Sequence, residues 1–226
     1  MTTTVKECQQ LADCFKLLAV FFYEPEMALW KQEDILNQFS STVQTISSGA
    51  FHLAQQMRDA NEEIDEEQMK VDYAALFVGP FELQAAPYGS IYLDKSKRIM
   101  GDSTMAVLQL YREAGLKLDV KDAPDHIAIE LEFIHYLYSL EAEAIQDGDN
   151  EKAIRVANLR THFLSSCLVP WVHPFCQSIK NGTNNVFYVN LADCLEVFIA
   201  ELSELASIPL QDHSLLAKEN ADQPSV

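Results

Sequence analysis

The sequence is poor in glycine, with seven among 226 residues, and it contains no phosphate-binding motif. Neither G-x-x-x-x-G-K nor G-x-G-x-x-G occurs, so the backbone cradle that nucleotide enzymes use for phosphate is missing. The nucleophile motif G-x-S-x-G is missing as well. The sequence therefore gives no support to nucleotide binding or to hydrolase chemistry, and we expect no cofactor.

Basic residues are also scarce, with 16 Lys and Arg against 34 Asp and Glu, and the formal charge is −18. Nucleic acids and anionic membranes attract stripes of Lys and Arg, so we expect neither as a partner, whereas a basic ligand would be attracted. Acidity that serves only solubility is the alternative interpretation. The apolar run from Leu17 to Tyr23 is too short to span a bilayer and no basic leader precedes it, which predicts a cytoplasmic protein without stable membrane insertion.

Cysteines are few, and their spacing indicates neither pairing nor metal binding. No C-x-x-C pair occurs, so a disulfide framework and a zinc site are both unsupported. Most lie on apolar helix faces, where cysteine behaves as a small buried hydrophobe. Glu132 and His135 have the E-x-x-H spacing of di-iron bundles, but no second copy occurs, so we expect no metal site. The cysteines are Cys8, Cys14, Cys167, Cys176 and Cys194.

Apolar residues at helical spacing, by contrast, are abundant. Phe15, Leu18 and Phe22 share one helical stripe, and similar patterns recur along most of the chain. No alternation typical of strands appears. Because packing helix on helix is then the remaining way to bury these stripes, we predict an all-α fold. It would be a single bundle of about nine or ten helices over residues 1–209, followed by a polar C-terminal tail over residues 210–226.

A long loop is predicted between the helix that ends near residue 79 and the helix that begins near residue 103. Gly79 is placed to cap the first of these in a left-handed conformation. The loop carries Phe81, Tyr88 and Tyr92, and loops of this length commonly bind ligands. A hinge is predicted at residues 116–123. Two oligomeric states are then open, a monomer and a homodimer that exchanges helices by domain swapping.

Asp125, His126 and Glu130 stand at the start of the next helical pattern. Asp122 can cap this helix, and Pro124 fits its first turn, where a missing N–H costs nothing. Glu130 follows His126 by one helical turn. Two interpretations are open: a helix-start aspartate with a His–Glu pair at the surface, or carboxylates that receive guanidinium groups beside the aromatic loop.

Four groups of residues, taken in order, resemble the TorD/DmsD/NarJ family of chaperones that assist maturation of molybdenum-cofactor oxidoreductases. They are Tyr73-x-x-Leu76-Phe77, Pro87-x-Gly-Ser-Ile-Tyr-Leu-Asp94, Met100-Gly-Asp-Ser-Thr104, and Pro124-Asp-His126 with Glu130-Leu-Glu-Phe133. The later segments Leu168-Val-Pro-Trp171 and Phe187-Tyr188 are also similar to the family. The glycine before Ser90 makes the loop most similar to the DmsD-like members.

The resemblance implies an all-helical cytoplasmic chaperone rather than an enzyme. Such a protein binds the twin-arginine signal peptide of a molybdoenzyme precursor of the DMSO/TMAO-reductase type, and it delays export until the cofactor is inserted. The alternative is a NarJ-like assembly factor that binds an unexported catalytic subunit without needing a twin-arginine signal. The implied signal-peptide site comprises Tyr73, Leu76, Phe77, Pro87, Tyr88, Tyr92, Gly101, Asp125, His126 and Glu130.

Some of these residues also have a purely structural interpretation. Leu76 and Phe77 could be ordinary core residues, and Gly101 could be a simple turn glycine. If the site is a peptide groove, its acidic and aromatic side chains should line an open cleft.

Overall fold

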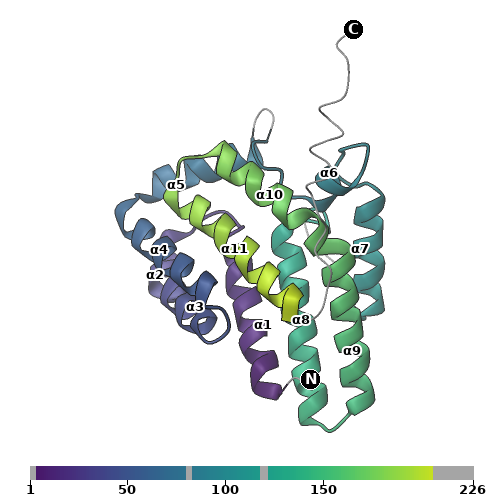
Figure 1. Ribbon diagram of the computed structural model, residues 1–226. Coiled ribbons are helices and arrows are strands. Elements are labelled where there is room, and N and C mark those ends of the chain that lie inside the picture. Colours follow the sequence, from purple (N-terminus) through teal and green to yellow (C-terminus); the bar gives the residue numbers. More distant parts are fainter. Residues whose placement is uncertain (1–3, 80–82, 118–121, 206–226) are drawn as a thin grey trace.

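The computed structural model describes residues 4–79, 83–117 and 122–205, and these ranges are predominantly helical (Figure 1). The helices are α1 (Val5–Val20), α2 (Met27–Gln32), α3 (Ile35–Gln44), α4 (Ser48–Glu63), α5 (Glu66–Tyr73), α6 (Gly89–Leu93), α7 (Asp102–Glu113), α8 (Ile127–Gln146), α9 (Asn150–Phe163), α10 (Val169–Gly182) and α11 (Val186–Leu205), with π-helical turns η1 (Ala74–Val78) and η2 (Leu164–Leu168).

Several of these segments run on without a break. Counting α5 with η1, and α9 with η2 and α10, gives ten helical rods in the described ranges. No strand is assigned in those ranges, and β-type pairing is limited to an isolated bridge between Tyr88 and His126. The predicted all-α bundle of about nine or ten helices is confirmed.

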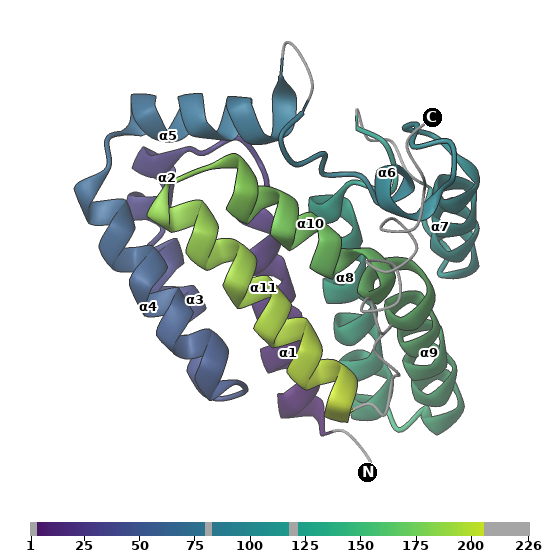
Figure 2. The same cartoon turned by 45° about the horizontal axis from the view of Figure 1, so that its top comes forward.

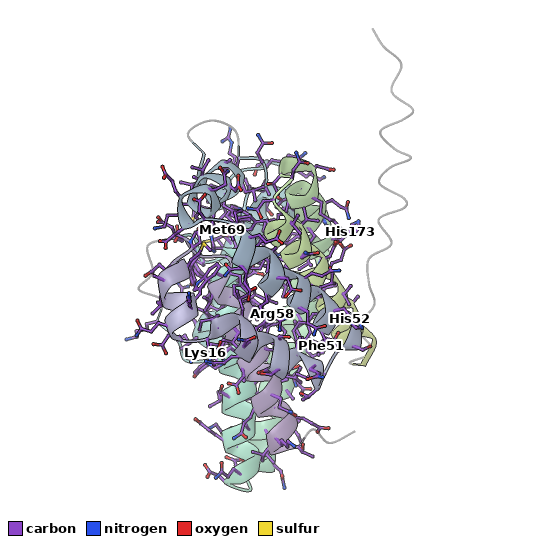
Figure 3. All side chains as sticks on the ribbon, turned by 90° about the vertical axis from the view of Figure 1, so that its left-hand side faces the viewer. Lys16, Phe51, His52, Arg58, Met69 and His173 are labelled. Carbon is purple, nitrogen blue, oxygen red and sulfur yellow. The ribbon has the colours of Figure 1, made fainter. Side chains whose placement is uncertain are left out.

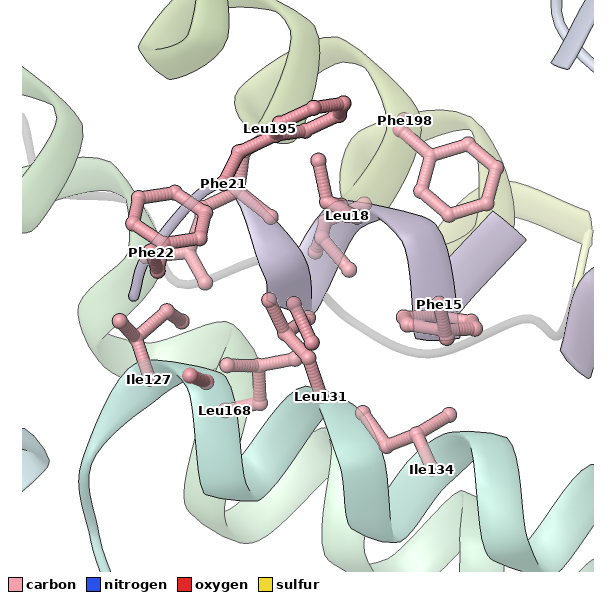
Figure 4. Packing of buried hydrophobic residues seen from close by; sticks show 14 of the residues in the cluster. Phe15, Leu18, Phe21, Phe22, Ile127, Leu131, Ile134, Leu168, Leu195 and Phe198 are labelled. Atoms are coloured by element: carbon pink, nitrogen blue, oxygen red, sulfur yellow. The ribbon is translucent and has the colours of Figure 1, made fainter. Parts of the chain in front are cut away.

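Helix α1 lies at the centre of the hydrophobic core. It packs chiefly against α8, while α11 packs against α4 and α10. Figure 4 shows α1 between α8, which carries Ile127, and α11, which carries Leu195. Phe15 of α1 contacts the rings of Phe198 and Tyr138, with centroids 5.3 and 5.8 Å away. Burying one such ring contributes about 1.5–3 kcal/mol, so this junction anchors the bundle.

The remaining helices surround this centre. Helices α3 and α4 pack on one side of the bundle and α7 and α9 on the other, as Figures 1 and 2 show. Figure 3 shows the α3–α4 side, where Phe51, His52 and Arg58 follow one another along α4. Helices α5, α6 and α10 lie across one end (Figure 2), and α6 packs on both α7 and α10. This end brings most of the motif residues into one region.

Two local predictions need correction. The long loop between residues 79 and 103 is interrupted by the short helix α6. The helix predicted to start near Asp122 and Pro124 starts at Ile127 instead, with His126 as its N-cap. The cap of η1 agrees better with the prediction, because Gly79 has a φ of 78°, which favours glycine.

The predicted burial of the cysteines is confirmed, because all five lie in the interior. Among the described residues, none of the helices is both long enough and apolar enough to cross a membrane. The predicted tail at 210–226 and the middle of the predicted hinge, residues 118–121, lie outside the described residues.

Candidate functional site

A short segment crosses the start of α8 and holds the motif residues in place. We call residues Pro87–Tyr92 the clip. The Gly89 N–H donates to the Asp125 carbonyl at 2.9 Å, and the Ile127 N–H donates to the Pro87 carbonyl at 2.8 Å. These bonds give the antiparallel bridge between Tyr88 and His126. Two motifs far apart in sequence therefore form one local structure.

Asp125 joins the clip through its side chain as well. Its Oδ2 accepts a 2.7 Å hydrogen bond from the Ser90 N–H, and the residue is only 1% exposed. The first N–H groups of a helix lack internal partners, and the cap residue Tyr88 supplies no side-chain bond to α6. Asp125 thus serves α6 as a cap from another segment. The expectation that Asp125 lies in the first turn of its own helix is wrong.

His126 is buried at the junction of α8 and the clip. Its Nδ1 accepts from the Ala128 N–H at 3.2 Å, which caps α8. The ring stacks on Tyr23 and meets Tyr88 edge-on, with centroids 6.2 and 5.3 Å away. Burial lowers the pKa of His126 to about 4, against smaller opposing effects of nearby carboxylates, so the imidazole is neutral at neutral pH.

Glu130 is also sealed inside, with 1% of its surface exposed. Its Oε2 accepts a 3.2 Å hydrogen bond from the indole N–H of Trp171 on α10. Burial raises the pKa of Glu130 well above its ordinary value, and the negative charge of Asp125 raises it further, while the Trp171 bond acts in the opposite direction. The interpretation of His126 and Glu130 as a pair at the surface is wrong, because both residues are buried.

Three apolar residues of the implied signal-peptide site, Tyr73, Leu76 and Phe77, lie in the core. Tyr73 is 9% exposed, Leu76 is fully buried and Phe77 is 4% exposed. Phe77 nevertheless connects with the clip through Phe175 of α10, whose ring centroid lies 6.2 Å from that of Phe77 and 6.1 Å from that of Tyr92. The core interpretation of Leu76 and Phe77 is therefore correct. A substitution of Phe77 would affect ligand binding at the clip only indirectly, through its packing against Phe175.

Trp171 is the central residue that the predicted set left out. It is fully buried, stacks on Tyr92 at 5.7 Å, and its Nε1 would lie 3.1 Å from a Cβ at position 89. A side chain at position 89 would therefore crowd the indole, and glycine allows the close approach without a shift of the ring. The signal that could have found Trp171 was its place in the Leu168–Trp171 motif, together with the glycine in the loop.

Gly101 lies against the side chain of Asp94. A Cβ at position 101 would lie 1.9 Å from Asp94 Oδ2. That carboxylate accepts from the Ser103 N–H at 3.3 Å through its Oδ1, at the start of α7. The turn interpretation of Gly101 is supported, because the missing side chain makes room for this cap.

The predicted open cleft beside Asp125 does not match the geometry. Pro87, Asp125, His126 and Glu130 are all buried, whereas Tyr88 and Tyr92 of the clip are half-buried. A shallow, open furrow of about 530 Å³ lies elsewhere, along α5 and the first residue of η1. It is lined by Glu66, Glu67, Lys70, Val71 and Ala74. The sequence interpretation did not single out this surface.

The fold is shared with proteins of redox-enzyme maturation. A crystal structure of a candidate redox enzyme maturation protein from Archaeoglobus fulgidus matches with a TM-score of 0.51 and 21% identity, over 85% of this chain and 93% of that one. At this identity the match speaks for the fold alone.

The chain belongs to the nitrate reductase delta subunit family, whose model matches residues 43–177. It is 29% identical to the probable Tat proofreading chaperone DmsD of Haemophilus influenzae, over 81% of this chain and 85% of the relative. It is 28% identical to the chaperone protein TorD of Photobacterium profundum, over 58% of this chain and 60% of that one. A perchlorate reductase assembly chaperone protein of Dechloromonas aromatica is 29% identical, over 59% of this chain and 62% of that relative. The predicted TorD/DmsD/NarJ membership is confirmed.

Proposed function

We propose that this protein is a cytoplasmic chaperone that binds the twin-arginine signal peptide of a molybdenum-cofactor oxidoreductase precursor and assists cofactor insertion before export. Family membership and the named Tat proofreading relatives support this role. They favour it over the NarJ-like alternative, in which an unexported subunit is bound without such a signal. The role is one of binding, and it assigns no catalytic residue.

The observation that carries the proposal is the convergence of the motif residues at one end of the bundle. The clip, the start of α8 and Trp171 meet there through the hydrogen bonds described above. Tyr88 and Tyr92 are partly accessible at this junction, next to two carboxyl groups. A twin-arginine leader offers cations followed by an apolar stretch, which complements rings beside acids.

The charge of the whole chain supports the same partner. A formal charge of −18 creates a field that steers a cationic peptide toward the protein. The furrow on α5 adds open apolar surface at Val71 and Ala74, bordered by Glu66 and Glu67. It is a second place where the apolar part of a leader could lie, so the test below separates the two surfaces.

The test is a calorimetric titration of the protein with a synthetic peptide that carries two adjacent arginines and an apolar helix-forming stretch. We expect binding that weakens as salt rises. Replacing both arginines by lysine should weaken binding, because lysine cannot form the bidentate bond to a carboxylate. Absence of binding heat at high peptide concentration would count against the proposal.

Two matched variants locate the surface. Tyr88→Ala removes a half-buried ring of the clip, and Val71→Ala shortens a side chain that is 56% exposed beside the α5 furrow. We expect a loss of affinity from the first and little change from the second. Capture of a client that lacks its signal, with no binding of the peptide, would favour the NarJ-like alternative instead.

A further inference from the structure

The segment between α6 and α7 is basic and exposed, although the protein as a whole is acidic. Three of the 16 Lys and Arg of the chain lie within residues 95–98, and none of the three forms an ion pair with a residue that the structure describes. Three apolar side chains close to them in the chain are between 44% and 58% exposed. We call these six residues the basic patch: Lys95, Lys97, Arg98, Ile99, Met100 and Met105. Exposed apolar side chains beside charges are typical of contact surfaces.

The backbone of the basic patch is also held in an uncommon conformation. Lys97 and Met100 have φ values of 47° and 67°, and in the described ranges Asp34 is the only other residue besides glycine with a positive φ. Residues with a side chain rarely adopt this region, and they keep it mostly where it serves a function. Residues 95–100 are all exposed, so the conformation serves no packing in the interior.

An acidic surface with exposed apolar side chains lies along α5. It includes the furrow lined by Glu66, Glu67, Lys70, Val71 and Ala74. Lys70 already pairs with Glu66 at 2.7 Å. This hydrogen bond raises the pKa of Lys70, and the charges of Glu24 and Glu26 add to the effect, so two acids from another segment lie near the furrow. We call the furrow together with Glu24 and Glu26 the acidic face.

The basic patch and the acidic face complement each other. Glu24, Glu26 and Glu67 are exposed and form no ion pair with a described residue, as is true of the three cations of the basic patch. Each surface also has exposed apolar side chains, Val71 on one and Met100 on the other. The two surfaces lie at the same end of the bundle, where Figure 2 shows α5 and α6.

We infer that the basic patch and the acidic face are the two halves of a homodimer interface, so that the partner at this end of the bundle is a second copy of the chain. In a dimer with two-fold symmetry, the basic patch of each copy meets the acidic face of the other, and the contact forms twice. Two small contacts that form together bind more tightly than either does alone. No helix is exchanged, which distinguishes this dimer from a domain-swapped one.

A second copy fits both surfaces, whereas other partners fit one. A nucleic acid or an anionic lipid surface offers no cation to the acidic face, and a cationic peptide offers no acid to the basic patch. The formal charge of −18 repels two copies at long range, but screening at physiological ionic strength limits this repulsion to about 8 Å. At contact the local pairs of opposite charge decide which surfaces meet.

The experiment measures the mass of the full chain by sedimentation over a range of concentrations at physiological salt. We expect a monomer–dimer equilibrium that shifts towards the monomer on dilution. Lys97→Glu with Arg98→Glu makes the basic patch acidic, and Glu26→Lys with Glu67→Lys makes the acidic face basic. Each double variant alone should raise the dissociation constant about tenfold or more, because both contacts then join like charges.

Mixing the two double variants should restore the dimer. Every contact between one variant and the other again joins opposite charges, so the mixture should associate although neither variant associates alone. Lys6→Glu with Lys16→Glu, at two exposed positions of α1, changes the net charge by the same amount as the basic-patch variant. This control should leave the dissociation constant of the wild type unchanged.

The inference goes beyond the proposed function and does not rest on it, so the two fail separately. A wild type that stays monomeric at every concentration would overturn the dimer and leave the chaperone role intact. A dimer that survives in both double variants would overturn it as well, because domain swapping or another surface would then hold the copies. A monomeric wild type that binds phosphatidylglycerol vesicles through Lys97 and Arg98 would assign the basic patch to a lipid surface instead. The wild-type measurement decides even if a variant fails to fold.

Discussion

Two buried clusters of charged residues in this protein are built in opposite ways. Between α8 and α9, Arg160 donates two hydrogen bonds to Glu141 Oε2 at 2.7 and 3.1 Å. Its guanidinium also lies 3.9 Å from the centroid of the Tyr138 ring and donates to the Tyr138 hydroxyl. At the other end of α8, Asp125 and Glu130 are buried just as deeply, and neither forms an ion pair with another residue that the structure describes.

The difference is whether a buried carboxyl group has a cation as its partner within the described residues. Glu141 already has its guanidinium, so an incoming arginine would gain nothing there. Within the described ranges, Asp125 accepts instead from a backbone N–H and Glu130 from an indole N–H.

Removing the cation from the compensated cluster should have the largest effect. Arg160→Met leaves Glu141 buried and unpaired, which costs about 3–5 kcal/mol of unfolding free energy. Urea denaturation measures this loss. Arg155→Met, on the exposed face of the same helix, is the control and should change stability by less than about 0.5 kcal/mol. Equal effects of the two substitutions would show that the Arg160 pair is not a structural anchor.

The uncompensated cluster should make stability depend on pH. Because the pKa of Glu130 is raised on folding, the folded state binds more protons, and this contribution to stability is lost as pH rises above the ordinary glutamate range. Glu130→Gln removes this pH dependence. The free energy of unfolding of the variant should therefore increase relative to that of the wild type as pH rises. The pKa of His126 is lowered to about 4, so protonation of His126 destabilises the folded state as pH falls. This contribution is the same in the wild type and in Glu130→Gln, so it cancels when the stabilities of the two proteins are subtracted. A pH-independent difference in denaturation midpoint would contradict this view of Glu130.

Loosening the clip should have an intermediate effect. Asp125→Ala leaves the Ser90 N–H without its acceptor, at a cost of about 1–3 kcal/mol, whereas Asp125→Asn keeps an oxygen there and should cost less. Hydrogen exchange of the Ser90 amide measures clip opening directly, and we expect faster exchange in the alanine variant. Unchanged exchange in both variants would mean that Asp125 does not hold the clip.

The smallest effect is expected from the indole. Trp171→Phe removes one hydrogen bond to Glu130 and should cost about 0.5–1.5 kcal/mol, apart from the change in ring volume. Trp30→Phe makes the same change in ring volume at another buried position, away from Glu130, and so measures the effect of volume alone. Since the Trp171 bond lowers the pKa of Glu130, its loss should also steepen the pH dependence of stability. A shallower dependence would show that the bond does not stabilise the charged form.

Much of the site could be located from the sequence, but not its geometry. The motif order placed Pro87, Asp125 and Glu130 in one region, and the structure brings them together. Exposure could not be read from the motifs, because whether a carboxylate at a helix start faces water depends on what packs over it. Here the clip covers Asp125, and Trp171 from a distant helix covers Glu130.

The sequence by itself determined the helical class, the buried cysteines and the family, because hydrophobic period, residue spacing and motif order are properties of the chain. Only the tertiary structure decided that α8 starts at Ile127, that Gly101 accommodates Asp94, and that Glu141 of α8 meets a guanidinium whereas Glu130 meets an indole. The physical reason is that hydrogen bonds and desolvation depend on neighbours from remote segments, which a linear pattern does not specify.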